Sequence, residues 1–114
     1  MDAFGPWLAQ LRKGVVELLV LSLLRARGPL HGYGIVQELE ELGDLVAGVS
    51  TVYPVLKRLE ADALVSSSWG EGTEAGRRKY YAITPAGASF LDEGARQFDD
   101  LHAALGRIGG DRDE

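Results

Sequence analysis

The first apolar segment of the chain predicts a long helix. Apolar residues recur at helical spacing from about Leu8 to Ala26, and within the run Val15–Leu24 only Glu17 and Ser22 interrupt them. A helix that is apolar on nearly all sides needs burial on all sides, which one small domain seldom provides alone. Gly28-Pro29 follows as a stop signal. The pattern predicts either a central core helix or a helix that a partner subunit covers in part.

Two shorter helices follow. One is predicted from about Tyr33 to Glu41. Gly43, two residues further on, can close this helix in the left-handed conformation. The other starts at Ser50 or Thr51, either of which can cap it. This third helix buries one apolar stripe and turns a cationic and aromatic face outward. The expected stripe is Val52, Leu56, Leu59 and Ala63, and the expected outer face is Ser50, Tyr53, Pro54, Lys57, Arg58 and Ala61.

Beyond the third helix the apolar period changes to alternation, which predicts β-strands. Val65–Trp69 and Arg77–Ile83 are the expected strands, and the glycine-rich segment Gly70–Gly76 is the expected turn between them. Three helices followed by a β-hairpin is the element order of a winged helix-turn-helix domain.

A final helix is predicted from Pro85, with Thr84 as its cap, to about Ile108, before Gly109-Gly110 and a frayed tail. Its apolar residues follow the heptad spacing of a coiled coil over about three heptads, and packing on its own domain would give the same pattern. A glycine at position 94 costs about 1 kcal/mol relative to alanine unless a close approach offsets it. The expected dimerisation residues are Leu91, Gly94, Phe98, Leu101, Leu105 and Ile108.

These elements predict a mainly α fold with a β-hairpin (α+β). The expected division is a winged helix-turn-helix DNA-binding domain at residues 1–84, a C-terminal dimerisation helix at 85–108 and a frayed tail at 109–114.

Composition excludes several classes of protein. The 114 residues suffice for one domain, and 46% hydrophobic with 25% charged residues is globular composition. The absence of cysteine excludes disulfides, thiolate catalysis and zinc fingers. The longest apolar run is too short and too charged for a membrane span, and no small-residue cleavage site follows it. We therefore expect a soluble, cytoplasmic protein with no membrane partner.

An enzymatic function is not expected. Acidic pairs such as Asp92-Glu93 and Asp99-Asp100 are adjacent in sequence, so their carboxylates do not face each other on a helix. His31 and His102 have no metal-ligand spacing, and the chain has no phosphate-binding Gly-Lys-Ser/Thr motif. We expect no catalytic residue, no metal and no cofactor.

The charge distribution points to the middle of the chain. The net charge of −5 taken alone argues against a nucleic-acid partner. Residues 50–84, however, hold five basic and four acidic side chains, whereas residues 85–114 hold three basic and seven acidic ones. An anion that binds this chain is therefore expected to bind its middle third.

Two segments carry these cations. The outer face of the third helix suits groove and phosphate contacts, and Gly76–Tyr81, with three consecutive cations beside two tyrosines, suits the stem of a wing on the sugar-phosphate backbone. A solvated helix face and an edge strand protected from aggregation are the alternatives. The turn holds Glu71 and Glu74 but no cation, so we expect contact from the stem and no deep insertion of the tip.

Several short motifs occur in one order along residues 14–91. They are His31-Gly-Tyr-Gly-Ile35, Ser50-Thr-Val-Tyr-Pro-Val-Leu-Lys-Arg-Leu-Glu60, Trp69, Gly76-Arg-Arg-Lys-Tyr-Tyr81, Ile83-Thr84 and Gly87. In this order they resemble the PadR family of bacterial transcriptional regulators. The resemblance implies a winged-helix dimer that represses transcription from a palindromic operator, often relieved by a small molecule.

The resemblance also assigns residues. With a single C-terminal helix, the chain resembles the short class, in which this helix and the N-terminal helix form the dimer. Phe98 stands where some short members have a tryptophan beside a central pocket, so it is the expected contact of a small aromatic or hydrophobic ligand, without the indole donor. Family members typically have Glu or another long side chain at the position of Gly34. The expected DNA contacts are Tyr33, Ser50, Thr51, Tyr53, Pro54, Lys57, Arg58, Arg77, Arg78 and Lys79.

The expected function is a homodimeric regulator, most simply a repressor, that binds double-stranded operator DNA. A winged-helix module that binds another protein and a ligand-sequestering dimer without a DNA target are the alternatives. Salt dependence separates them, because binding through phosphate contacts weakens steeply as salt rises, whereas a largely apolar protein contact changes little.

Overall fold

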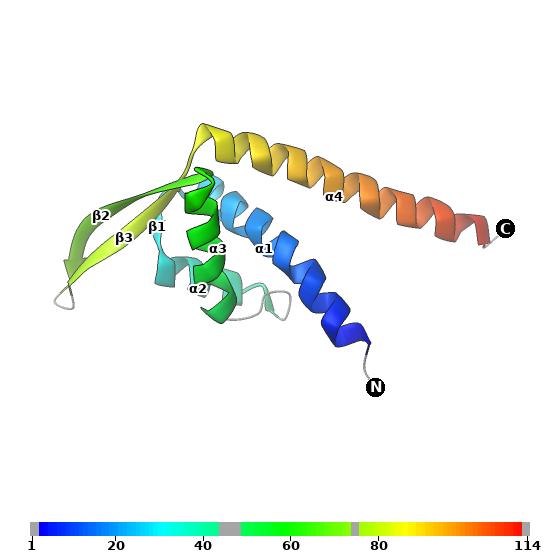
Figure 1. Ribbon diagram of the computed structural model, residues 1–114, viewed down its shortest axis with the longest axis horizontal. Helices are drawn as coiled ribbons and strands as arrows, with labels where there is room; N and C mark the ends of the chain where they lie inside the picture. Colours follow the sequence, from blue (N-terminus) through cyan, green and yellow to red (C-terminus); the bar gives the residue numbers. More distant parts are fainter. Residues whose placement is uncertain (1–2, 44–48, 74–75, 113–114) are drawn as a thin grey trace.

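The computed structural model describes residues 3–43, 49–73 and 76–112. The chain forms four helices and a small sheet, and the ends of two of these helices extend from the body of the molecule (Figure 1). This arrangement confirms the predicted mainly helical winged-helix fold with a long C-terminal helix. The elements are α1 (Phe4–Arg27), β1 (Leu30–His31), α2 (Gly32–Glu40), α3 (Val49–Ala61), β2 (Val65–Thr73), β3 (Gly76–Ile83) and α4 (Pro85–Arg112).

The sheet has three antiparallel strands in the order β1-β3-β2. Its edge strand β1 was not predicted, because two residues are too few to show a period; Leu30 pairs with Tyr81 and His31 with Tyr80. The predicted seven-residue turn was wrong, since the strands stay paired out to Thr73 and Gly76, with an irregularity after Gly70. Glycine suits position 70 because a Cβ there would lie 2.6 Å from the Tyr80 ring.

One apolar core joins α1, α2 and α3 to strands β2 and β3 and to the start of α4. The predicted stripe of α3 is confirmed at three of its four positions, and Val55 is buried beside it. The buried side chains of the core are Val16, Val20, Leu21, Leu24, Ile35, Val36, Leu39, Val52, Val55, Leu56, Leu59, Val65, Tyr81 and Leu91.

Ala63, the fourth predicted stripe residue, lies beyond the end of α3 and is exposed, so that prediction was wrong. The helix closes with a Schellman pair of bonds, from the N–H of Leu64 to the carbonyl of Leu59 and from the N–H of Ala63 to the carbonyl of Glu60. Ala63 takes the left-handed conformation, with φ of 60°, that this closure requires. The chain therefore leaves the helix two residues before the apolar spacing ends.

Helix boundaries differ from the predicted ones. Helix α1 begins at Phe4 and not at Leu8, and α3 begins at Val49, so Ser50 and Thr51 lie within its first turn and not at its cap. The predicted end of the last helix at Ile108 was also wrong, because α4 continues through both glycines to Arg112. Two glycines in succession weaken a helix but leave its hydrogen-bond ladder intact, so they do not end it as a proline would.

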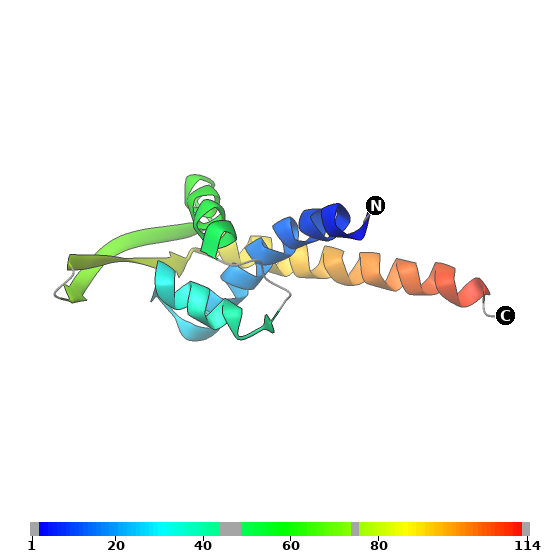
Figure 2. The same ribbon diagram turned by 90° about the horizontal axis from the view of Figure 1, so that it is seen from below.

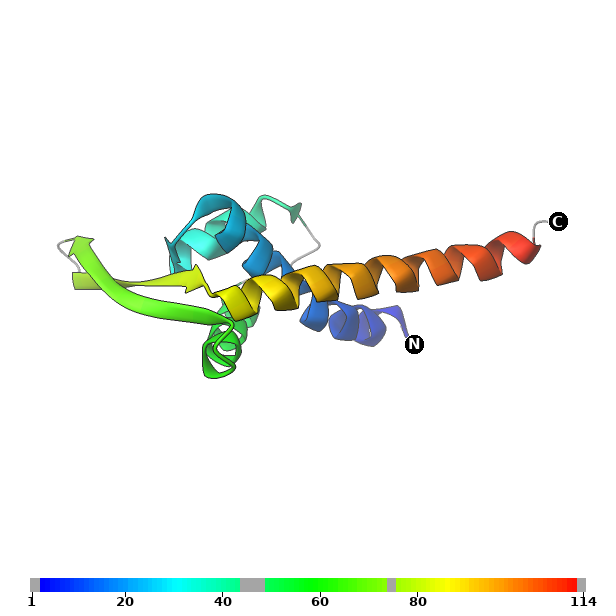
Figure 3. The same ribbon diagram turned by 90° about the horizontal axis from the view of Figure 1, so that it is seen from above.

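Helix α1 is buried along one stripe and half-buried beside it, so it is not enclosed on all sides within this chain. Its fully buried residues lie between Val16 and Leu24, whereas Phe4, Trp7 and Leu11 near its start are exposed. In Figures 1 to 3 the first turns of α1 and the last turns of α4 project from the body on the side opposite the β2–β3 hairpin.

The start of α4 is fixed to the end of α3. The predicted cap is confirmed: the Thr84 hydroxyl oxygen accepts from the N–H of Gly87 at 3.0 Å, and the hydroxyl donates to the carbonyl of Ala63 at 2.7 Å. Leu91 is 2% exposed against the core, and further along a Cβ on Gly94 would lie 2.6 Å from a methyl group of Leu18. No described helix is long and apolar enough to cross a membrane.

Candidate nucleic-acid interface

The outer face of α3 is exposed as predicted. Tyr53 is 44% exposed, and Pro54, Lys57 and Arg58 are also exposed. The side chains of Ser50 and Thr51 lie outside the described residues. The helix thus presents an aromatic ring and two cations to solvent on the side that faces away from the core.

Arg58 is held by a buried acid of α1. Its Nη1 atom lies 3.1 Å from Oε2 of Glu17, whose side chain is only 10% exposed. The sequence showed Glu17 as an isolated charge inside an apolar run, but its partner, 41 positions later, was not predicted. The ion pair neutralises part of the charge of Arg58 and ties α3 to α1.

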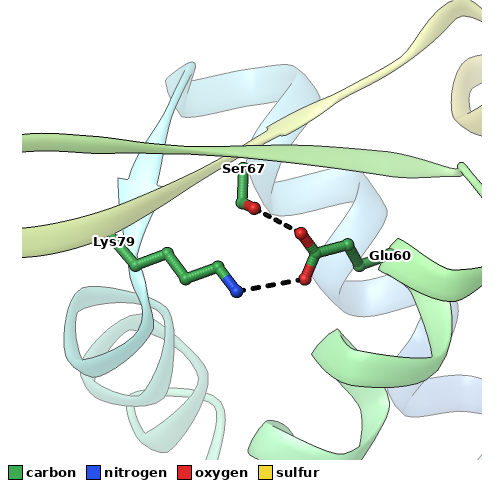
Figure 4. A network of polar contacts seen from close by, with 3 residues as sticks. All are labelled: Glu60, Ser67 and Lys79. Atoms are coloured by element: carbon green, nitrogen blue, oxygen red, sulfur yellow. Dashed lines mark hydrogen bonds and ion pairs between the residues drawn. The ribbon is translucent and has the colours of Figure 1, made fainter.

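Lys79 on β3 is also engaged within the chain. Its Nζ donates to Oε1 of Glu60 at 3.2 Å and lies 5.6 Å from the centroid of the Tyr81 ring, and the hydroxyl of Ser67 donates to the other oxygen of Glu60 (Figure 4). The Ser67 hydroxyl and the Lys79 ammonium hold the pKa of Glu60 below its ordinary value, although burial opposes them. This network joins α3 to the wing, and Lys79 contributes less free charge than its sequence position suggested.

The other two wing cations differ in their surroundings. Arg77 is exposed at the far end of β3, and Arg78 reaches back so that its Nη1 lies 2.7 Å from Nε2 of His31. His31 was noted in the sequence only for lacking metal-ligand spacing and as part of the family motif. Its place next to Arg78 depends on the short β1–β3 pairing, which no periodicity reveals.

A hollow of about 380 Å³ collects residues from four elements. A Cβ on Gly32 would lie 2.6 Å from the Tyr53 ring, so this glycine lets the ring of α3 lie against the start of α2. Tyr33, predicted as a DNA contact, is 59% exposed at the rim. Lys57, Arg58 and Arg77 lie outside the lining. The lining residues are His31, Gly32, Tyr33, Tyr53, Arg78, Lys79 and Tyr81.

The predicted dimerisation residues of α4 fall into two groups. Leu91 and Gly94 pack within the chain, on the core and on Leu18, so Leu91, expected in the dimer seam, is already buried without a partner subunit. The close approach expected of Gly94 exists, but to α1 of the same chain. The remaining apolar side chains are exposed, with Phe98 at 46% and the others near 70%; they are Phe98, Leu101, Leu105 and Ile108.

Among the described residues, no group of three or more His, Asp and Glu side chains lies close enough together to hold a metal ion. The chemistry that this face offers is therefore that of hydrogen-bond donors and positive charge: exposed cations on α3 and β3, a histidine ring and two tyrosine hydroxyls. Such groups bind phosphates and base edges.

A winged helix with such a face is the architecture of a transcriptional regulator, and comparison with known families gives the same class. Residues 20–93 match the family described as "Transcriptional regulator PadR-like family". The chain belongs to this family, which confirms the resemblance found in the sequence. Membership in a family of transcriptional regulators also confirms that the chain is not an enzyme.

Two individual relatives are similar to most of the chain. The chain is 37% identical over 93 residues to the transcriptional regulator Rv3488 of Mycobacterium tuberculosis, covering 81% of this chain and 83% of that protein. It is 38% identical over 91 residues to an uncharacterised 37.1 kDa protein in transposon TN4556 of Streptomyces fradiae, of which it spans only 25%.

Solved structures share the fold. A PadR family transcriptional regulator from Eggerthella lenta is 34% identical with a TM-score of 0.81, and the match covers 94% of this chain and 92% of that one. Bacillus subtilis PadR, solved in complex with operator DNA, is 32% identical with a TM-score of 0.62 over 69% of this chain and 45% of that chain.

Proposed function

We propose that this protein binds double-stranded operator DNA as a homodimer and represses transcription. The observation that carries the proposal is the clustering of α3 and β3 side chains on one hollow, with Tyr53, Arg78 and Lys79 in its lining and Lys57 exposed on the same helix as Tyr53. The DNA complex of a relative that is 32% identical supports it. In this proposal α3 enters the major groove and the stem of the wing contacts the adjacent backbone.

The predicted contacts divide by their surroundings. Lys57, Arg77 and Arg78 contact phosphates, and Tyr53 reads base edges or a phosphate from the N-terminal half of α3. Arg58 and Lys79 act differently, since their partners Glu17 and Glu60 take up part of their charge. They hold α3 and the wing in the binding arrangement.

The dimer forms through the exposed apolar side chains of α4, together with those of α1 near the same end of the molecule. A two-fold dimer of winged helices reads a palindromic operator whose half-sites lie roughly 10 base pairs, or a multiple of that, apart. A small aromatic ligand that stacks on the two Phe98 rings at the axis would change the spacing of the two α3 helices and relieve repression.

The test is the binding of labelled duplexes by fluorescence anisotropy over a range of salt concentrations, with the operator identified by a genome-wide footprint. We expect Lys57→Ala and Arg78→Ala each to weaken binding and to reduce the slope of log affinity against log salt by about one unit, because each removes one phosphate contact. Arg107→Ala, an exposed cation near the far end of α4, is the control and leaves both values unchanged.

Wild-type affinity in a Lys57→Ala/Arg78→Ala double variant contradicts the assignment of both elements to DNA. A wild-type chain without salt-dependent binding to any duplex contradicts the proposed function, and favours a winged-helix module that binds protein or sequesters a ligand.

A further inference from the structure

The ring of His31 touches a hydrogen-bond donor with each of its nitrogens. The backbone N–H of Gly34 points to Nδ1 at 3.1 Å, and Nη1 of Arg78 lies 2.7 Å from Nε2. The first contact caps α2, and the ring also packs edge-to-face with the Tyr80 ring, with the centroids 5.6 Å apart. The ring is therefore fixed on one side, with Nε2 turned toward Arg78 and the hollow.

The two contacts cannot both be hydrogen bonds. An arginine side chain has only donors, and so has a backbone N–H. A neutral imidazole has one nitrogen that accepts and one that carries a proton, and a protonated imidazole has two donors. In every protonation state, therefore, at least one of the two contacts brings two donors together.

The cap is the contact that persists. It joins residues three positions apart and satisfies an N–H that the helix itself cannot pair. Arg78, by contrast, is an exposed side chain with several rotatable bonds. When Nδ1 accepts from Gly34, the ring proton lies on Nε2. Nε2–H and the guanidinium of Arg78 then point into the same space, where an acceptor is needed between them.

The surroundings select the kind of acceptor. Besides His31, the described lining of the hollow contains Arg78, Lys79 and the three tyrosines Tyr33, Tyr53 and Tyr81, and no carboxylate. A backbone phosphate matches this set, because its oxygens accept several hydrogen bonds and carry the negative charge that guanidinium favours.

We propose that His31 is a DNA-contacting residue: its Nε2–H and the guanidinium of Arg78 together bind one oxygen of a backbone phosphate at the hollow. This inference rests on the proposed function. In the free chain the two donors, Nε2–H and the guanidinium, face each other without an acceptor between them. When the phosphate enters, its oxygen accepts from both, and Arg78 moves away from Nε2 to share that oxygen.

The first test uses His31→Asn. Asparagine caps a helix as well as any residue but is too short to carry a donor to the position of Nε2. We expect binding roughly ten- to hundredfold weaker, the range for losing a hydrogen bond to a charged group, on the operator and on a duplex of unrelated sequence alike. The thermal unfolding midpoint should stay at the wild-type value. His102→Asn on α4 is the matched control and binds as the wild type does.

Combining His31→Asn with Arg78→Gln tests the shared oxygen. If both side chains bind the same phosphate, the double variant is weakened by less than the product of the two single effects. Independent effects that multiply contradict a shared phosphate.

The second test reads the ring directly. In nitrogen-15 NMR spectra of the wild-type protein saturated with duplex, we expect His31 with its proton on Nε2 and an unprotonated Nδ1. A ring protonated on Nδ1 in the complex overturns the inference, and so does wild-type affinity of His31→Asn under conditions in which Lys57→Ala weakens binding. The latter result leaves the proposed function standing, whereas a wild-type chain that binds no duplex removes both.

Discussion

At the scale of single residues, the glycines of α4 differ in how much space surrounds the position of a side chain. A Cβ on Gly87 would lie 2.1 Å from the carbonyl oxygen of Leu64, which is backbone and cannot move aside. Gly106, in the same helix, has nothing within 4 Å of its Cβ position. The glycine at position 87 is therefore required by the close approach of α4 to the chain that leaves α3.

We expect Gly87→Ala to lower the free energy of unfolding by about 2–3 kcal/mol, because the clash must separate α4 from the end of α3. Gly106→Ala is its control and raises the free energy of unfolding by up to about 1 kcal/mol, the helix-propensity difference between the two residues. Urea unfolding at one fixed protein concentration measures both. Equal effects of the two substitutions would contradict the close packing at Gly87.

At the scale of elements, ion pairs connect α3 to α1 on one side and to the wing on the other. Glu17 of α1 holds Arg58 in the last turn of α3, and Glu60 in that same turn holds Lys79 of the wing. Both cations belong to the proposed interface, whereas Glu17 lies on α1 and Glu60 lies on α3 itself. Helix α3 is thereby fixed in orientation by carboxylates that, under the proposed function, compete with phosphate for the same cations.

Arg58→Ala leaves the carboxylate of Glu17 buried without its partner. We expect a loss of about 1–2 kcal/mol in the free energy of unfolding, less than for a fully buried pair because Arg58 reaches solvent. Adding Glu17→Gln should restore part of the loss, since a buried amide costs less than an unpaired charge. Lys57→Ala, which removes the neighbouring exposed cation, should leave stability unchanged. Urea unfolding of the four proteins decides, and an Arg58→Ala variant as stable as the wild type would show that the pair contributes nothing.

At the scale of the whole molecule, the shape separates two surfaces. The molecule is 62 Å along its longest axis, with the wing toward one end and the free turns of α1 and α4 toward the other (Figure 3). Exposed Phe98, Leu101, Leu105 and Ile108 lie on the part of α4 beyond its contact with Leu18. A partner that covers them binds far from the hollow beside α3, so dimerisation leaves the proposed DNA face open.

Leu101→Asp tests this arrangement. Because Leu101 is 69% exposed in the single chain, the charge is harmless to a monomer but lies unpaired in an apolar interface of a dimer. We expect dissociation at micromolar concentration in analytical ultracentrifugation, and poor solubility of the released chain. Ala103→Asp adds the same charge to an exposed position of the same helix outside the heptad seam and should leave the dimer intact. A dimeric Leu101→Asp protein would contradict the seam, and the ligand pocket at Phe98 with it.

Local order in the chain was largely predictable from the sequence. The helical spacing of Val52, Leu56 and Leu59 predicted the buried side of α3, the alternation after it predicted the hairpin, and Thr84 with Pro85 predicted the start of α4. These features depend on residues a few positions apart, whose period and capping chemistry act in the same way in any fold. The motifs of residues 14–91 were specific enough to predict the family.

The partners of the charged side chains were decided only by the tertiary structure. Arg58, Arg78 and Lys79 were equivalent cations in the sequence, yet Glu17, His31 and Glu60 engage them to different extents. Likewise Leu91 and Phe98 share one heptad position, but only Leu91 reaches the core of its own domain. Such differences depend on how helices cross and strands pair between segments far apart in the chain. Spacing along the sequence determines which residues share a face of an element, whereas packing between elements determines what that face meets.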